Sequence, residues 1–272
     1  MNIESLNYSR IENLFSVKGK IVLITGAGGL GECFAKGFAV NGSVVLIASK
    51  TVSKCEKICD ELRKDGYTSC EAFHLDVSDE KEVAKLCEDI VKKFGRIDVV
   101  VHTAALCRLH DTLADGNEDL FLQHFQVNMA GSRNVDRIFG NQMAKQGWGR
   151  IINVNTMSSL SVNSPDGFSY GVTKTGLRQI TRYFAVAFAK TGVTVNEINP
   201  VWIHTPMMAT RSEDYWNHCI DQTPMGRVAV PEDYMGIVLY MASEAGRYMT
   251  GQSVSVDGGW SVSRVFTFDQ NK

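Results

Sequence analysis

A tyrosine and a lysine, Tyr170 and Lys174, stand four residues apart. On a helix, this spacing places both side chains on one face. A free phenol has a pKa of about 10, and an ammonium group held nearby favours the phenolate and lowers that pKa. Such a phenol can donate a proton to a carbonyl oxygen, or accept one from an alcohol, near neutral pH. The pair is therefore a candidate acid–base couple that needs a reaction partner.

A glycine-rich turn near the start of the chain indicates that partner. Residues 20–24 read Lys-Ile-Val-Leu-Ile, and the next seven residues read Thr-Gly-Ala-Gly-Gly-Leu-Gly. A G-x-G-x-x-G spacing between a strand and a helix is typical of a dinucleotide-binding turn, whose backbone approaches a pyrophosphate. A P-loop is disfavoured because Glu32 stands where a lysine would be needed. The predicted phosphate contacts are Gly26, Gly28, Gly29, Leu30 and Gly31.

Short apolar runs alternate with amphipathic stretches along the chain. The predicted strands are residues 20–24, 43–48, 69–75, 97–102, 150–155, 194–199 and 253–256. The predicted helices are residues 31–41, 52–64, 80–94, 118–146, 169–191 and 231–243. Strands that are apolar on both faces and separated by helices indicate a parallel sheet, and right-handed crossovers make it doubly wound. We therefore predict an α/β fold with a seven-stranded, Rossmann-type parallel sheet and helices on both faces.

Length and composition narrow the class of protein. The 272 residues, 44% of them hydrophobic, suit a single domain over residues 19–272 behind an N-terminal arm over residues 1–18. A net charge of −2 gives no sign of a nucleic-acid surface, and no apolar run approaches the ~20 residues of a membrane span. Residues 203–225 fit neither period and contain Pro206 and Pro224, so we predict a mobile lid there.

The seven cysteines form no C-x-x-C pair and are odd in number. This usage is typical of free thiols in a reducing compartment and offers no metal site. The N-terminus also lacks the apolar core of a signal peptide. We therefore predict a cytoplasmic protein.

The end of the second predicted strand bears on the choice of cofactor. NAD-preferring sites usually carry an acid here for the ribose 2′-hydroxyl, whereas this strand ends in Ala-Ser-Lys, at residues 48–50. Ser49 and Lys50 are therefore predicted cofactor contacts, with Lys50 placed to meet a 2′-phosphate. The simpler alternative is a solvated lysine at the start of a helix. The sequence favours NADP(H) and leaves NAD(H) possible.

Together these features resemble the short-chain dehydrogenase/reductase family, over nearly all of residues 18–262. The resembling segments also include Asp76-Val77, residues 102–105, 127–131, 199–207 and 255–259. The resemblance implies that Asn128 is catalytic and holds a water that links Lys174 to solvent. It also implies cofactor contacts from Asp76, Val77, Thr103, Ala104, Tyr170, Lys174, Pro200, Ile203 and Thr205.

The chain departs from the family pattern at several positions. The glycine turn is one residue shorter than the usual Thr-Gly-x-x-x-Gly-x-Gly. His102 and Ala105 replace the first Asn and the Gly of Asn-Asn-Ala-Gly, and Val201 replaces the Gly after Pro200. None of these changes removes a proton-transfer group, but each can change cofactor affinity or pocket shape.

The hydroxyl group that assists Tyr170 has two candidates. In the family, a serine at the end of the fifth strand precedes the tyrosine by about thirteen residues. Thr156 precedes Tyr170 by fourteen residues and fits the strand register, whereas Ser158 precedes it by twelve and fits the residue type. Either hydroxyl can bond a substrate oxygen.

The resemblance implies reversible hydride transfer between a nicotinamide and the carbonyl carbon of a small-molecule substrate. The apolar residues within 201–220 favour a hydroxysteroid or another bulky ketone, whereas residues 14–20 and 156–158 resemble the sugar-acid and polyol branch of the family. A non-catalytic nucleotide-binding sensor or scaffold is the alternative from another class; it would not need Asn128, Tyr170 and Lys174 together. The resemblance further implies a homotetramer or homodimer that packs residues 118–146 and 169–191 across two-fold axes, with no nucleic-acid or membrane partner.

Overall fold

A parallel sheet forms the centre of the molecule. The computed structural model describes residues 11–108, 117–162, 167–205, 208 and 210–263. In this part of the chain the strands are β1 (Ile21–Thr25), β2 (Val44–Ser49), β3 (Cys70–His74), β4 (Val99–His102), β5 (Gly149–Val154), β6 (Val193–Pro200) and β7 (Ser253–Val256). The order β3-β2-β1-β4-β5-β6-β7 is doubly wound, with the reversal between β1 and β4. The predicted strands and fold class are confirmed, with strand ends shifted by at most two residues.

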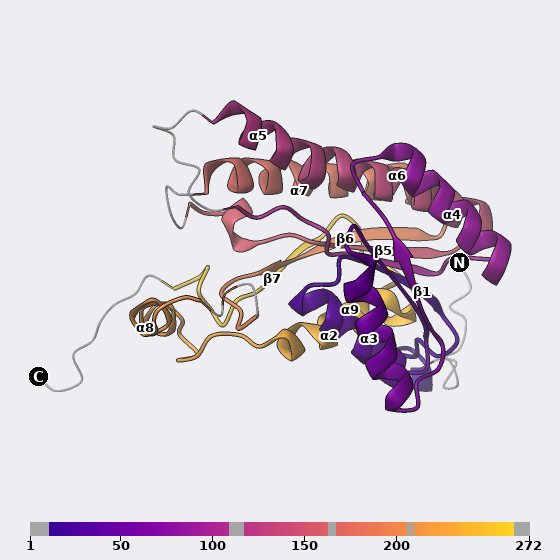
Figure 1. The fold of residues 1–272 in the computed structure, drawn as a ribbon, viewed down its shortest axis with the longest axis horizontal. Coiled ribbons are helices and arrows are strands. Elements are labelled where there is room, and N and C mark those ends of the chain that lie inside the picture. The colour runs from indigo at the N-terminus through magenta and orange to yellow at the C-terminus, as the bar shows by residue number, and fades with distance from the viewer. Residues whose placement is uncertain (1–10, 109–116, 163–166, 206–207, 209, 264–272) are drawn as a thin grey trace, which may run out of the picture.

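Helices cover both faces of the sheet (Figure 1). One layer holds α2 (Gly29–Val40), α3 (Val52–Lys64) and α9 (Met235–Ala242). The other holds α4 (Glu80–Phe94), α5 (Glu118–His124), α6 (Ser132–Gln146) and α7 (Phe168–Phe188). A separate buried apolar cluster lies under each layer, around Phe34 and Phe38 on one side and Phe139 and Met143 on the other.

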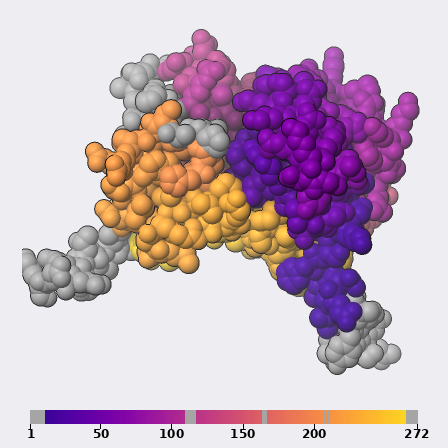
Figure 2. Space-filling view, turned by 60° about the horizontal axis from the view of Figure 1, so that its bottom comes forward, coloured from indigo at the N-terminus to yellow at the C-terminus, as the bar shows by residue number. Residues whose placement is uncertain are grey.

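One predicted helix and the predicted lid differ from expectation. The stretch 118–146 is helical throughout, but its centre, η1 (Phe125–Gly131), is a π-helix between α5 and α6. The predicted lid over 203–225 contains the helix α8 (Glu213–Asp221), and Figure 2 shows the orange region that includes it at one side of the molecule, with the purple N-terminal residues at the other. Its residues 206, 207 and 209 lie outside the described part, as do residues 1–10 of the predicted arm, and movement of the lid stays a prediction.

Short helical turns connect some of these elements. They are η2 (Met157–Ser159), η4 (Pro231–Tyr234) and η5 (Glu244–Gly246). No helix within the described residues is long and apolar enough to span a bilayer.

A row of polar side chains crosses five neighbouring strands, which corrects the prediction that each strand is apolar on both faces. Its members, Thr25, His102, Asn153, Glu197 and Ser253, are aligned by the strand register. Register-aligned residues point to the same face of a sheet. We call this set the polar row. Its first four members are at most 1% exposed. Buried polar groups must bond to protein, so the row constrains the helices above it.

Partners for the row come from α6 and α7. Asn153 donates from Nδ2 to Asp136 Oδ2 at 2.9 Å and to Thr181 Oγ1 at 3.0 Å. Thr181 in turn donates to Glu197 Oε2 at 3.2 Å, and Arg178 Nε lies 3.4 Å from Glu197 Oε1. These bonds fix the rotation of both helices about their axes against the sheet.

Asp136 is the least satisfied partner of the row. Its Oδ1 and the Oδ1 of Asn153 are buried without a hydrogen-bond partner among the described residues. Burial raises the pKa of Asp136 to about 7; the charge of Glu197 adds to this, and the bond from Asn153 partly offsets it. The carboxyl group therefore ionises near neutral pH rather than near pH 4.

Replacing Asp136 by Asn should remove a pH-dependent loss of stability. The folded protein holds this proton up to about pH 7, whereas an unfolded aspartate releases it near pH 4, so stability falls as pH rises between these values. The single group changes the free energy of unfolding by up to about 1.4 kcal/mol per pH unit. Urea unfolding at pH 5 and pH 8 should show a flatter pH dependence for Asp136→Asn than for wild type.

The exposed Asp65, just after α3, provides the matched control, because Asp65→Asn removes a carboxyl group that is in water. Its pH dependence should follow that of the wild type. An equal pH dependence in Asp136→Asn and Asp65→Asn would contradict the assignment.

Candidate active site

The predicted site residues gather beyond the carboxyl ends of the central strands, where doubly wound proteins bind ligands. The glycine turn follows β1, and Thr103 and Ala104 follow β4. Thr156 lies two residues beyond β5. The helix α7 carries Tyr170 and Lys174 to the same edge.

The glycine turn fits a pyrophosphate. A Cβ on Gly31 would lie 2.1 Å from the carbonyl oxygen of Gly26, so helix α2 can approach the turn only because residue 31 is a glycine. Gly26 has a φ of 92°, a conformation that favours glycine. A Cβ on Gly28 would meet nothing within 4 Å, and Gly28 caps α2 without a side-chain bond. Open space thus faces a helix N-terminus whose first N–H groups lack helical partners, which suits a phosphate.

The loop after β4 is bonded to this turn. Thr103 donates from Oγ1 to the carbonyl oxygen of Thr25 at 2.6 Å, and the Ala104 N–H lies 3.4 Å from Thr25 Oγ1. Both predicted cofactor contacts therefore lie against the glycine turn.

The residues predicted to contact the adenosine end also lie together. Lys50 Nζ is 2.6 Å from Asp76 Oδ2, so these two predicted contacts form an ion pair across the ends of β2 and β3. Ser49 donates from Oγ to the Thr51 carbonyl oxygen at 3.0 Å. Val77 is buried, and its carbonyl oxygen accepts a bond from Asn134 at 3.2 Å.

The three predicted contacts after β6 differ in accessibility. Pro200 ends β6 and is buried. Ile203 is also buried, and its main chain forms an isolated bridge with Ala229. Thr205 is half-buried and directly precedes residues 206–207.

Of the two candidate hydroxyl groups, the structure brings Thr156 to the phenol. The Thr156 side chain forms a hydrogen bond with Tyr170. Thr156 Oγ1 also accepts a bond from the Ser158 N–H at 3.3 Å, which caps η2. Ser158 thus supports Thr156 through its main chain.

The pKa of Tyr170 is raised rather than lowered, so the prediction of a lowered pKa is wrong in this structure. Burial is the main cause, the nearby Cys107 thiol adds to it, and the bond with Thr156 partly offsets it. Lys174 Nζ lies 5.9 Å from the centroid of the tyrosine ring and donates to the Val154 carbonyl oxygen at 2.8 Å. The ammonium is thus bonded to the strand end rather than to the phenol.

Lys174 is itself destabilised as a cation. Burial lowers its pKa to about 8, although Glu197 and Cys107 act in the opposite direction. An ammonium group has three N–H donors, and among the described residues only Val154 accepts one of them. Two donors therefore remain for hydroxyl groups of a bound ribose.

The side chain of Asn128 is fully bonded to protein. Its Oδ1 accepts from the Leu106 N–H at 2.7 Å, and its Nδ2 donates to the Leu106 carbonyl oxygen at 2.9 Å and to Thr173 Oγ1 at 3.2 Å. The amide thus holds the loop after β4 against η1 and α7. The predicted bond from Asn128 to a water stays a prediction.

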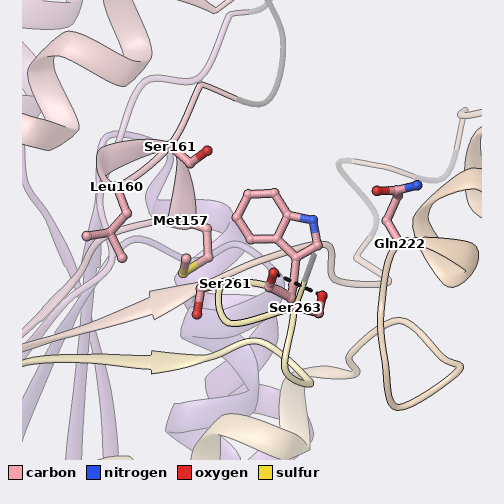
Figure 3. A pocket seen from close by; sticks show the side chains of 7 residues that line it. Met157, Leu160, Ser161, Gln222, Ser261 and Ser263 are labelled. Carbon is pink, nitrogen blue, oxygen red and sulfur yellow. Dashed lines mark hydrogen bonds between the residues drawn. The ribbon is translucent and has the colours of Figure 1, made fainter. Parts of the chain in front are cut away.

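A cavity of about 370 Å³ opens beside η2. Figure 3 shows Met157, Leu160 and Ser161 on one side of it and Gln222 on the other. Its lining residues are Met157, Leu160, Ser161, Gln222, Trp260, Ser261 and Ser263. Sequence reasoning missed Trp260, although a tryptophan directly after the Gly-Gly of the last matched segment was a usable signal.

The aromatic side chains of the predicted lid pack on one another. The rings of His204 and Trp216 stack with centroids 4.1 Å apart, and Tyr215 meets Trp216 edge-on at 5.4 Å. Trp202 contacts Trp260 edge-on at 5.6 Å. These aromatic side chains, which we expected to contact an apolar substrate, thus pack largely against other side chains of the protein.

Comparisons with known proteins agree with this arrangement. The family model described as enoyl-(acyl carrier protein) reductase matches residues 26–261. The sorbose reductase sou1 of Schizosaccharomyces pombe is 32% identical over 91% of this chain and 98% of its own length. The galactitol 2-dehydrogenase (L-tagatose-forming) of Cereibacter sphaeroides is 30% identical over 92% and 98%.

A crystal structure shows the same likeness in three dimensions. A gluconate 5-dehydrogenase from Burkholderia cenocepacia J2315, in complex with NADP and tartrate, superposes with a TM-score of 0.86 at 25% identity, covering 93% of this chain and 99% of the other. Because sequence and fold agree over most of its length, the chain belongs to the short-chain dehydrogenase/reductase family of oxidoreductases.

Proposed function

We propose that this oxidoreductase uses NAD(P)(H) to interconvert a secondary alcohol and a ketone, with Tyr170 as general acid and base. The observation that carries the proposal is the contact of the Tyr170 phenol with Thr156, beside Lys174 and at the same end of the sheet as the glycine turn. The turn, Lys174 and the β4 loop would hold the cofactor. When bound, the nicotinamide supplies or accepts the hydride.

Each polar group has one task in this proposal. Because its pKa is raised, Tyr170 is protonated at neutral pH and can donate its proton to the substrate carbonyl oxygen. Thr156 orients that oxygen by a second hydrogen bond. Lys174 is charged below about pH 8 and stabilises the phenolate that proton transfer leaves behind. In oxidation, the phenolate takes the proton back from the alcohol.

Tyr170→Phe should lower kcat by about 10²–10⁴-fold, because it removes the general acid. The dissociation constant of the cofactor, followed by nicotinamide fluorescence, should change little. Thr156→Val should lower kcat by at least about tenfold, whereas Ser158→Ala should stay within a factor of about two, because of these two candidate hydroxyl groups Thr156 is the one that bonds to the phenol. A Phe variant with activity close to wild type would sink the assignment of Tyr170, and equal losses in Thr156→Val and Ser158→Ala would sink that of Thr156.

NADP(H) is the preferred cofactor in this proposal, and Lys50 is the residue that selects it. The Lys50 side chain is 66% exposed, so its pair with Asp76 contributes only about 0–1 kcal/mol. The lysine can therefore turn to a 2′-phosphate at little cost. The NADP in the gluconate 5-dehydrogenase complex supports this choice.

Lys50→Ala should raise KM for NADPH about tenfold, or about 1.4 kcal/mol, and leave KM for NADH nearly unchanged. Initial rates with both cofactors measure this difference. Lys54→Ala, which removes an exposed lysine one turn into α3, is the matched control. Equal effects of Lys50→Ala on both cofactors would show that Lys50 does not read the 2′-phosphate.

A sugar or polyol is the substrate class that the site supports best. The cavity beside η2 combines three serine hydroxyls and the Gln222 amide with the indole of Trp260, a mixture that suits the hydroxyl groups and C–H faces of a carbohydrate. The names of the sorbose reductase and the galactitol dehydrogenase agree with this class. A hydroxysteroid is less well supported, because the lid aromatics pack on one another.

A panel of ketohexoses, hexitols, sugar acids and ketosteroids should give the highest kcat/KM with a polyhydroxylated compound. Gln222→Ala should raise KM for that compound several-fold with little change in kcat, because the amide binds without touching the reacting atoms. A ketosteroid with the highest kcat/KM would overturn the substrate class. Cofactor binding without turnover of any compound would favour the non-catalytic nucleotide-binding alternative.

Assembly into a homotetramer or homodimer stays a proposal. The helix α7 exposes Val172, Tyr183 and Val186 to between 42% and 79%, and α5 exposes Leu122. An apolar face on these two helices supports packing against a second copy of the chain.

A further inference from the structure

His102 links the glycine turn to the helix that carries Asn128. Its imidazole is buried at the end of β4, between two hydroxyl groups. His102 Nδ1 is 2.7 Å from Thr25 Oγ1, and Nε2 is 2.9 Å from Ser132 Oγ. The Ser132 hydroxyl lies 2.7 Å from the main-chain carbonyl oxygen of Asn128. Three consecutive hydrogen bonds thus join the end of β1 to η1.

For a neutral imidazole, only one arrangement of protons satisfies all three hydrogen bonds. A carbonyl oxygen can only accept, so Ser132 donates its single proton to Asn128. Ser132 Oγ must then accept from His102, which places a proton on Nε2. His102 Nδ1 is consequently free to accept from the Thr25 hydroxyl. A neutral imidazole in this position is therefore the Nε2–H tautomer.

The surroundings of the ring favour this neutral form. Burial, with the positive charge of Lys174 as a second cause, lowers the pKa of His102 to about 3. Because this pKa lies far below neutral pH, the ring stays neutral from pH 6 to pH 9. The bond directions in the chain stay the same as pH changes.

This series of hydrogen bonds ends on a π-helical turn. Asn128 lies in the π-helical turn η1, where the regular α-helical hydrogen-bond pattern is interrupted. Its side chain is bonded to Leu106, and its carbonyl oxygen to Ser132. His102 is therefore linked, through Ser132, to the main-chain carbonyl oxygen of Asn128 in this turn.

We propose that His102 is a positioning residue, which as the Nε2–H tautomer fixes Ser132 and the Asn128 carbonyl group relative to the glycine turn. It touches no reacting atom. Its effect is to keep the proton-transfer side and the nucleotide side of the site in one geometry. This inference rests on the proposed function for its kinetic consequence, but not for its tautomer.

Paired variants separate the two bonds of the ring. The longer side chain of Gln places its amide nitrogen near the position of Nε2 and can still donate to Ser132, whereas the amide of Asn reaches only as far as Nδ1. His102→Gln should keep kcat within about threefold of wild type, and His102→Asn and Ser132→Ala should each lower it about tenfold. KM for cofactor and substrate should stay within about twofold. The Asn and Ala changes combined should cost no more than either alone, because both remove the same bond.

The tautomer has a readout that is independent of activity. Nitrogen-15 NMR distinguishes protonated from unprotonated ring nitrogens, and comparison with His102→Gln assigns the signals. His102 should show a protonated Nε2 and an unprotonated Nδ1 from pH 6 to pH 9. His124 is the internal control at pH 9: its Nδ1 lies 2.9 Å from the Leu120 carbonyl oxygen and its Nε2 accepts from the Arg108 N–H, so it should show the opposite tautomer.

Three outcomes have distinct meanings. A His102 signal that titrates between pH 6 and pH 9, or one with a protonated Nδ1, overturns the tautomer and with it the inference. Wild-type kcat in Ser132→Ala, or equal kcat in His102→Gln and His102→Asn, overturns the positioning role. Full activity in Tyr170→Phe refutes the proposed function and leaves the NMR result standing, so the two failures are distinguishable.

Discussion

The need to satisfy polar groups inside a sheet that is covered on both faces determines much of this structure. Little water reaches the centre of such a sheet, so every polar side chain of the polar row must find a partner within the protein, either on a neighbouring strand or loop or on the helices above it. On α7 those partners are Arg178, four residues after Lys174, and Thr181, three residues after Arg178. Residues at such spacings share one helix face, and Tyr170, four residues before Lys174, lies on the same face. The bonds that satisfy Glu197 thus also set the direction in which the phenol and the ammonium point.

Burial dominates the electrostatics of the site. It raises the pKa of Tyr170 and lowers that of Lys174, so each group is pushed toward its neutral form. A raised pKa makes the phenol a weaker acid, and burial outweighs the favourable effect of Glu197 on the Lys174 ammonium. When the phenol gives up its proton, each charge becomes the partner of the other in a medium of low dielectric constant, where their attraction is strong. The attraction between Tyr170 and Lys174 is therefore strongest once the phenol has lost its proton.

Local patterns made most of the fold predictable from sequence. The strands, the glycine turn and the Tyr170–Lys174 pair depend on residue type and spacing within a few positions, and the structure has each of them. The Lys50–Asp76 pair joins residues on different strands, so no local pattern reveals it. The pKa of Tyr170 was mispredicted because spacing indicates a neighbouring charge but not the depth of burial. Residue type and register disagreed at Thr156 and Ser158, and a tertiary contact distinguishes them.

The polar row stops at β1, and this has a consequence for how the molecule can change. On the other side of that strand the same register line continues through Ala48 and Phe73, which make no polar demand on the helices above. Lys50 and Asp76, which we propose face the adenosine end of the cofactor, lie in this apolar half, and the proposed proton-transfer groups lie over the bonded half. Substitutions that alter the choice of dinucleotide can therefore accumulate without disturbing the acid–base groups. The sheet is divided into one half that tolerates exchange and one that resists it, so cofactor selectivity and chemistry can evolve, or be engineered, separately.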